Sequence, residues 1–202
     1  MRPLAPLAAA AVLFAAPAAE ADGLSPSETA RLLRGEAVSR AQQLDRAGRH
    51  YVGGVTYAIV DAAPREVTAL LGDVGSWRRL LPRTREAALV GEAAGDPLID
   101  LTHGSALLQV SYTLRMHREG DGVRFWMDGS RHHDIDDAWG YARAAPMPGG
   151  RTLLTWGILV DMGPGLLREL FEGEVQAVAL TVPDRVRGVL FERSARGQRA
   201  AR

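Results

Sequence analysis

Residues 107–128 read LLQVSYTLRMHREGDGVRFWMD, and their pattern decides the fold class. Every second residue from 108 to 116 is apolar and the residues between them are polar, which predicts a strand with one buried face. The sequence Gly-Asp-Gly at 120–122 predicts a tight turn into a second strand at 123–128. We therefore expect an antiparallel pair of strands near the middle of the chain.

Similar patterns on both sides predict the remaining elements. Strands are expected at 51–60, 87–92, 98–103, 135–144 and 152–161, with an edge strand at 36–44. Short helices are expected near Ser25, Pro64 and Trp77, and a long helix is expected from 163 onward, with a kink at Pro183. The apolar stripe of the long helix recurs at spacings of three and four residues and consists of Leu167, Phe171, Val175, Val178, Val182, Val186 and Val189.

The composition excludes several classes of function. The 202 residues suit one globular domain, and 24 basic residues balance 24 acidic ones, which argues against a nucleic-acid partner. The absence of cysteine excludes disulfides, thiolate nucleophiles and cysteine-ligated metals. All 24 basic residues are arginine, so P-loop and Schiff-base lysines are excluded as well.

The first 21 residues have the pattern of a bacterial signal peptide. Arg2 precedes an apolar stretch at 4–16, and Ala-Glu-Ala at 19–21 fits the small-x-small cleavage rule. We expect export to the periplasm, with a mature chain beginning near Asp22. The alternatives are an uncleaved anchor and a low-complexity alanine tail.

Three short sequences, in this order, resemble a known family: AAPREV at 62–67, DVGSWRRLLP at 73–82 and GGRTLLTW at 149–156. They are similar to the helix-grip proteins of the START, polyketide-cyclase and Bet v 1-like (SRPBCC) superfamily, nearest its coenzyme-Q-binding and cyclase-like branch. The resemblance implies an α+β fold over about residues 50–192. In this fold a curved antiparallel sheet wraps around one long C-terminal helix, and two short helices follow the first core strand.

The resemblance and the local sequence patterns together suggest how the chain is divided. A START-like ligand-binding domain is expected at 49–193, preceded by a helix and edge strand at 22–48 and followed by a disordered basic tail at 194–202. The segment 22–48 and the export signal are departures from the family pattern.

The expected function follows from the cavity that such a fold leaves between sheet and helix. The resemblance implies binding or carriage of a hydrophobic small molecule, such as a lipid, quinone or polycyclic compound, without a cofactor. Transient contact with a membrane is compatible with this role, and the oligomeric state is left open. The alternatives are a cyclase or hydrolase acting in the same cavity, and a scaffold whose own side chains fill the cavity.

The candidate ligand-binding residues are apolar, aromatic or polar side chains expected to face this cavity. His103 is a candidate polar handle or general base, with a satisfied core histidine as the alternative, and Trp77 is a candidate portal residue. Plain core packing is the alternative for the aromatic residues. The full set is Trp77, Leu81, His103, Val110, Tyr112, Phe125, Trp139, Tyr141, Arg143, Trp156, Phe171, Val175 and Val178.

The sequence RHHDIDD at 131–137 is rich in metal-ligating residue types. Adjacent side chains on an extended chain point in opposite directions, so His132 and His133 are poorly placed to share one ion. We expect a solvated turn here and no metal site.

Overall fold

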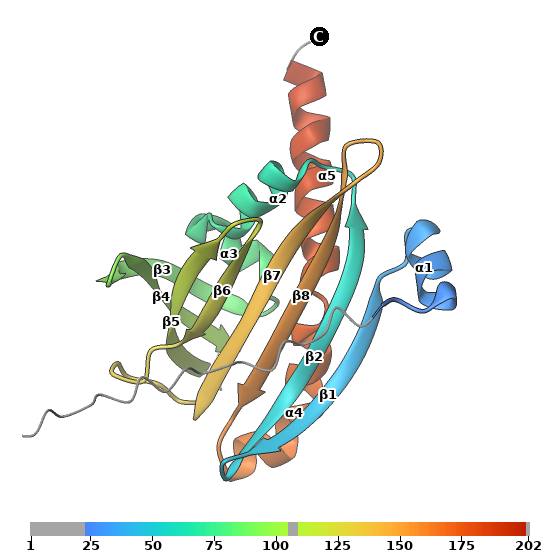
Figure 1. Cartoon of the computed structure of the whole chain (residues 1–202). Coiled ribbons are helices and arrows are strands. Elements are labelled where there is room, and N and C mark those ends of the chain that lie inside the picture. Colours follow the sequence, from blue (N-terminus) through green and yellow to red (C-terminus); the bar gives the residue numbers. More distant parts are fainter. Residues whose placement is uncertain (1–22, 105–108, 201–202) are drawn as a thin grey trace, which may run out of the picture.

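The computed structural model describes residues 23–104 and 109–200, so the expected signal peptide lies outside the described residues. The fold is one eight-stranded antiparallel sheet in the order β1-β2-β8-β7-β6-β5-β4-β3, with all helices except the first packed on its concave face (Figure 1). The strands are β1 (Val38–Arg46), β2 (Arg49–Val60), β3 (Thr84–Ala93), β4 (Asp96–Gly104), β5 (Gln109–Glu119), β6 (Gly122–Met127), β7 (Asp137–Met147) and β8 (Arg151–Asp161). This arrangement confirms the predicted α+β fold with a curved sheet.

The helices begin where the sequence places caps and prolines. They are α1 (Pro26–Leu33), α2 (Pro64–Leu71), α3 (Val74–Leu80), α4 (Leu166–Ala179) and α5 (Val182–Ala200). In α1 the Ser25 hydroxyl accepts a hydrogen bond from the Glu28 backbone, and the Glu28 carboxylate accepts one from the Ser25 backbone. None of the described helices is long and apolar enough to cross a membrane.

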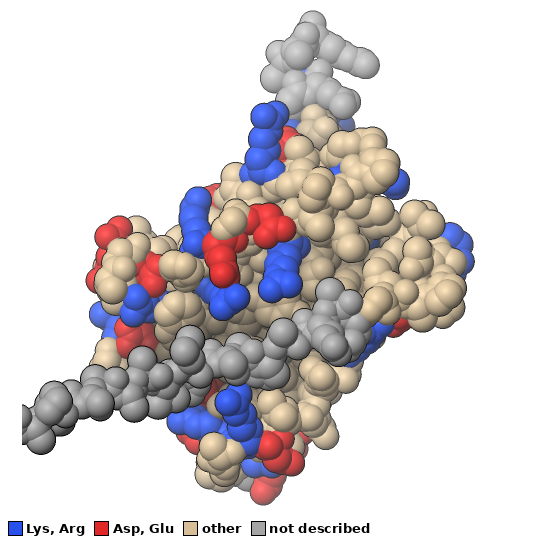
Figure 2. Space-filling view, in the orientation of Figure 1, with Lys and Arg blue, Asp and Glu red and all other residues tan. Residues whose placement is uncertain are grey.

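The segment before residue 49 belongs to the same sheet as the rest of the chain. As predicted, β1 is an edge strand, and it pairs with β2 along its whole length. Leu32 of α1 packs with Val38 and Ile59 in a small apolar cluster outside the main core. The outer face of the sheet is otherwise exposed, and acidic and basic side chains are interspersed on it (Figure 2).

The C-terminal helix is interrupted, where a kink at Pro183 was expected. α4 ends at Ala179, and Pro183 lies in the first turn of α5, where a missing backbone N–H has no cost. Two carbonyl groups freed at the interruption accept hydrogen bonds from the sheet: the Ala179 carbonyl from Trp156 Nε1 at 3.0 Å, and the Leu180 carbonyl from Thr56 Oγ1 at 2.9 Å.

α5 runs to Ala200 and projects beyond the sheet (Figure 1). It therefore continues past Arg193, after which the sequence predicts a disordered tail.

One strand presents the opposite face from the expected one. In β7 the small residues Ala138, Gly140 and Ala142 face the core, whereas Trp139 is 37% exposed on the outer face. The rings of Phe125 and Trp156 fill the space inside, and a side chain at Gly140 would collide with Phe125. The expectation that Trp139 shares the inner face with these two rings is therefore wrong.

Candidate functional site

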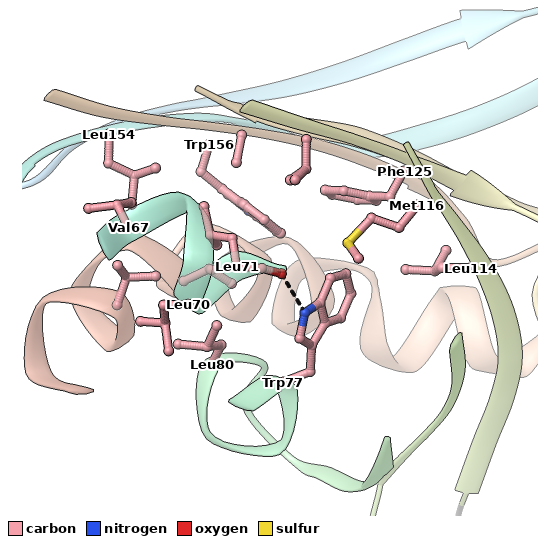
Figure 3. Packing of buried hydrophobic residues seen from close by; sticks show 14 of the residues in the cluster. Val67, Leu70, Leu71, Trp77, Leu80, Leu114, Met116, Phe125, Leu154 and Trp156 are labelled. Carbon is pink, nitrogen blue, oxygen red and sulfur yellow. Dashed lines mark hydrogen bonds between the residues drawn. The ribbon is translucent and has the colours of Figure 1, made fainter. Parts of the chain in front are cut away.

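The inner face of the sheet beneath α2, α3 and α5 is filled by the protein's own side chains (Figure 3). Trp77, Phe125 and Trp156 are each 3% exposed or less. The Trp77 and Phe125 rings meet edge to face with centroids 6.2 Å apart, and the Phe125 and Trp156 rings stack at 5.1 Å. Trp77 Nε1 donates a hydrogen bond to the Leu71 carbonyl at 2.8 Å. Trp77 is therefore a core residue, and its expected portal position is corrected.

The inner face near α4 is only partly covered. Its apolar side chains pack against the main core and yet stay partly exposed, in contrast to those beneath α5. We call this surface the α4 site, defined by Val110, Tyr112, Met127, Ile158, Met162 and Val175. It is the part of the inner face on which a hydrophobic molecule would find uncovered apolar surface.

A polar group adjoins this apolar surface. His103 on β4 and Tyr112 on β5 are stacked, with ring centroids 5.4 Å apart, and the Tyr112 hydroxyl lies 2.9 Å from His103 Nε2. The other ring nitrogen, Nδ1, lies 3.0 Å from the Thr84 hydroxyl at the start of β3. Three neighbouring strands thus hold one imidazole by both of its nitrogens.

Burial keeps this group uncharged. It lowers the pKa of His103 to about 4, and a hydrogen bond with the Pro82 backbone opposes the shift only in part. Burial also raises the pKa of Tyr112 above its usual value. Both side chains are therefore neutral at pH 7.

A neutral imidazole donates from one nitrogen and accepts at the other. If Nε2 donates to Tyr112, the tyrosyl hydrogen is free for an acceptor on a bound molecule. If Nδ1 donates to Thr84, Tyr112 instead donates to Nε2. The pair can therefore present either hydrogen-bonding polarity toward a ligand without a change in charge.

The other predicted site residues fall into two groups. On the inside, Phe171 and Val178 of α4 are half-buried, and Leu81 after α3 packs against the main core. On the outside, Tyr141 and Arg143 lie with Trp139 on the outer face of β7, and the Arg143 guanidinium lies 5.5 Å from the centre of the Tyr141 ring. These three β7 residues are away from the inner face.

Sequence reasoning left out some residues of the α4 site. Met127 continues the alternation of Phe125 by one more step, so the period of two was the signal for it. Thr84 carried no signal, because its contact with His103 depends on the register between β3 and β4.

The histidines of 131–137 have separate partners. His132 Nε2 lies 3.4 Å from the Asp134 carboxylate, and His133 Nδ1 lies 2.8 Å from the Ile135 carbonyl. Within residues 23–104 and 109–200 there is no group of three or more side chains that could hold a metal ion.

Comparison with known proteins yields matches among solved structures only. No protein-family model and no curated protein sequence matches the chain. The Zhui aromatase/cyclase from Streptomyces sp. R1128 superposes with a TM-score of 0.60 at 16% identity, over 77% of this chain and 96% of the enzyme. A STAR-related lipid transfer protein from Xanthomonas axonopodis gives 0.56 at 15% identity, over 75% and 98% of the two chains.

A START superfamily protein from Mycobacterium smegmatis gives a TM-score of 0.52 at 13% identity, over 67% of this chain and 97% of that protein. The chain has the START-like helix-grip fold. Because the identities are so low, the likeness concerns the fold alone. The function depends on the side chains in the helix-grip interior of this chain.

Proposed function

We propose that this protein is an exported binder or carrier of a hydrophobic small molecule, such as a lipid, a quinone or a polycyclic compound. The observation that carries the proposal is the partly covered apolar surface of the α4 site beside the neutral His103–Tyr112 pair. This combination suits an amphipathic molecule with an apolar body and one polar end.

The energetics are adequate for such a role. Each CH₂ group buried from water contributes roughly 0.8 kcal/mol, so an acyl or prenyl chain can reach micromolar affinity. The names of two structural neighbours, a lipid transfer protein and an aromatase/cyclase, support a hydrophobic ligand. Brief contact with a membrane would give the protein access to such a molecule.

Binding is favoured over catalysis by the state of His103. A general base works best when its pKa lies near the working pH. A histidine with a pKa of about 4, and with both nitrogens already in hydrogen bonds, is a weak base at pH 7. Among the described residues, the titratable side chain hydrogen-bonded to His103 is Tyr112, and burial raises its pKa further from neutrality.

The test is native mass spectrometry of the protein purified from its own cell envelope. We expect a bound hydrophobic molecule that is released on unfolding. An unliganded protein that also binds no added lipid, quinone or polycycle would overturn the proposal, and turnover of the molecule would establish the enzymatic alternative.

Export is tested on the same preparation. N-terminal sequencing should begin near Asp22 if residues 1–21 are a cleaved signal peptide. An intact Met1 in a cytosolic fraction would reject export while leaving ligand binding to be judged separately.

A further inference from the structure

A basic groove lies between the end of α3 and α5, apart from the α4 site. Its volume is about 390 Å³. Four arginines line it, Arg78, Arg79, Arg83 and Arg185, and Leu81 and Val189 contribute apolar surface. No part of the proposed ligand binding uses this groove.

The positive charge of the groove is only partly compensated. Its two acidic residues each have an arginine partner outside the groove: Asp184 lies 3.2 Å from Arg187, and Glu192 lies 3.1 Å from Arg196. Arg83 pairs with Glu174 of α4. Within the part of the chain that the structure describes, Arg78, Arg79 and Arg185 have no ion pair or hydrogen bond from their side chains. Three guanidinium groups are thus available to an anion.

This excess is local, because the whole chain is neutral. α5 carries five arginines against two acidic residues, and basic side chains are visible on its projecting part (Figure 2). A positive surface on a neutral protein marks one face for an anionic partner.

An exposed aromatic residue stands next to the groove. Phe191 of α5 is 75% exposed, the most exposed of the large hydrophobic residues in the described chain. It lies one turn from Gly188, which lines the groove, and points away from Val186, Val189 and Leu190, which are buried in the core. Core packing therefore gives no reason for a phenylalanine here.

We propose that the groove, together with Phe191, docks the protein on an anionic phospholipid membrane. Arginines bind phosphate groups well, and a helix with basic residues beside an exposed aromatic one suits the boundary between headgroups and acyl chains. A nucleic acid would satisfy the arginines but would leave Phe191 and the apolar part of the groove unexplained.

The position of the groove fits this role. Arg83 lines the groove, and the next residue, Thr84, contacts His103 beside the α4 site. Arg83 also forms an ion pair with Glu174 of α4, so the groove is connected to α4. Docking here would bring the α4 site close to the membrane surface. The inference goes beyond the proposed ligand binding and is measured without any ligand.

The experiment is co-sedimentation of the purified protein with vesicles. One set contains phosphatidylcholine alone, and the other contains phosphatidylcholine mixed with phosphatidylglycerol. We expect binding to the anionic vesicles only, weakening as salt is added. The double variant Arg78→Glu/Arg185→Glu should bind at least about tenfold more weakly, since each arginine near a membrane surface contributes measurably to binding.

One further variant tests the apolar contribution to membrane binding, and another is a control. Phe191→Ser should weaken binding and make the remainder more sensitive to salt, because it removes the apolar part of the contact. Arg46→Glu is the matched control, an exposed arginine at the β1–β2 turn, away from α3 and α5 (Figure 1). It should bind like the wild type. Unchanged melting temperatures show that the variants are folded.

The proposal is overturned if both vesicle types bind equally, or if Arg46→Glu weakens binding as much as the double variant does. Preference for single-stranded DNA over vesicles would assign the groove to a nucleic acid instead. Full competition by free inorganic phosphate would assign it to a soluble anion. Vesicle binding by a protein that neither carries a hydrophobic ligand nor takes up an added lipid, quinone or polycycle would contradict the proposed function and leave this inference standing.

Discussion

His103 and Tyr112 are held on adjacent strands, and burial disfavours the charged form of each. The histidine therefore links stability to pH in a defined direction. Its pKa in the folded protein, about 4, lies below its usual value of 6.5, so between these values the unfolded chain binds more protons than the folded one. The free energy of unfolding must then fall as the pH drops through this window.

The variant His103→Gln removes this contribution. The free energy of unfolding of the wild type should fall by up to roughly 3 kcal/mol between about pH 7 and pH 4 through His103 alone. In the variant, the free energy of unfolding should depend correspondingly less on pH. Urea unfolding at several pH values measures both slopes. Identical slopes would show that His103 is not the neutral buried group described above.

A second change at this scale concerns the hydroxyl of Tyr112. Tyr112→Phe keeps the ring stacked on His103 but removes the hydrogen bond to Nε2, which should cost about 1 kcal/mol of stability. It should also weaken binding of a fatty alcohol more than of the matching alkane. Tyr57→Phe, on the outer side of β2, is the control and should change neither measurement. Equal effects of the two variants would contradict the assignment.

At the scale of elements, the junction of α4 and α5 depends on side chains from the sheet. Thr56 is fully buried and donates to the Leu180 carbonyl. Thr56→Val keeps the shape but leaves that carbonyl unpaired, at a cost of about 1–3 kcal/mol. Denaturant unfolding should show this loss, with faster amide exchange around 178–182. Thr155→Val, on the outer face of β8, is the control and should have little effect on stability. An equal loss of stability in that variant would contradict a special role for the junction.

α4 is also fastened to β2 by an ionisable contact. His50 Nδ1 lies 2.6 Å from Asp45 and Nε2 lies 3.3 Å from Glu172 of α4, and hydrogen bonds to these two carboxylates raise the pKa of His50. The contact is thus fully formed below the usual pKa of histidine and is lost as the pH rises through the raised value. His50→Gln should destabilise the protein at about pH 6 and have almost no effect at about pH 9. A stability difference independent of pH would contradict this.

The elements differ in how far the sequence could predict them. The strands were predictable because alternation is local, and the edge strand β1 was found in the same way. The sequence did not predict which face of β7 points inward. Phe125 and Trp156 come from other strands, and they leave room only for small residues on the inner face of β7. The interruption between α4 and α5 at 180–181 was not predictable from local sequence either, since it depends on hydrogen bonds from Thr56 and Trp156.

At the scale of the whole molecule, the inner face of the sheet has two parts with different roles. Beneath α2, α3 and α5 it is closed by aromatic and aliphatic side chains, among them Trp77 and Phe125, and this part stabilises the fold. Near α4 it is partly covered, and His103 supplies the polar group. The two parts meet where α4 gives way to α5. A ligand in the α4 site would therefore leave the closed core intact, and blocking that site should spare the fold.

Val175→Trp tests this division. Val175 lies on α4, half-buried against the core, so a larger side chain there would occupy space that a ligand needs. Binding of a fluorescent lipid should fall at least about tenfold, since excluding two CH₂ groups already has this effect. The melting temperature should stay close to that of the wild type, because the closed part of the core is untouched.

Leu33→Trp is the control: it adds the same tryptophan on α1, where Leu33 is 59% exposed, and it should bind lipid normally. A folded Val175→Trp protein that binds lipid as tightly as the control would show that the α4 site is not where the molecule is held.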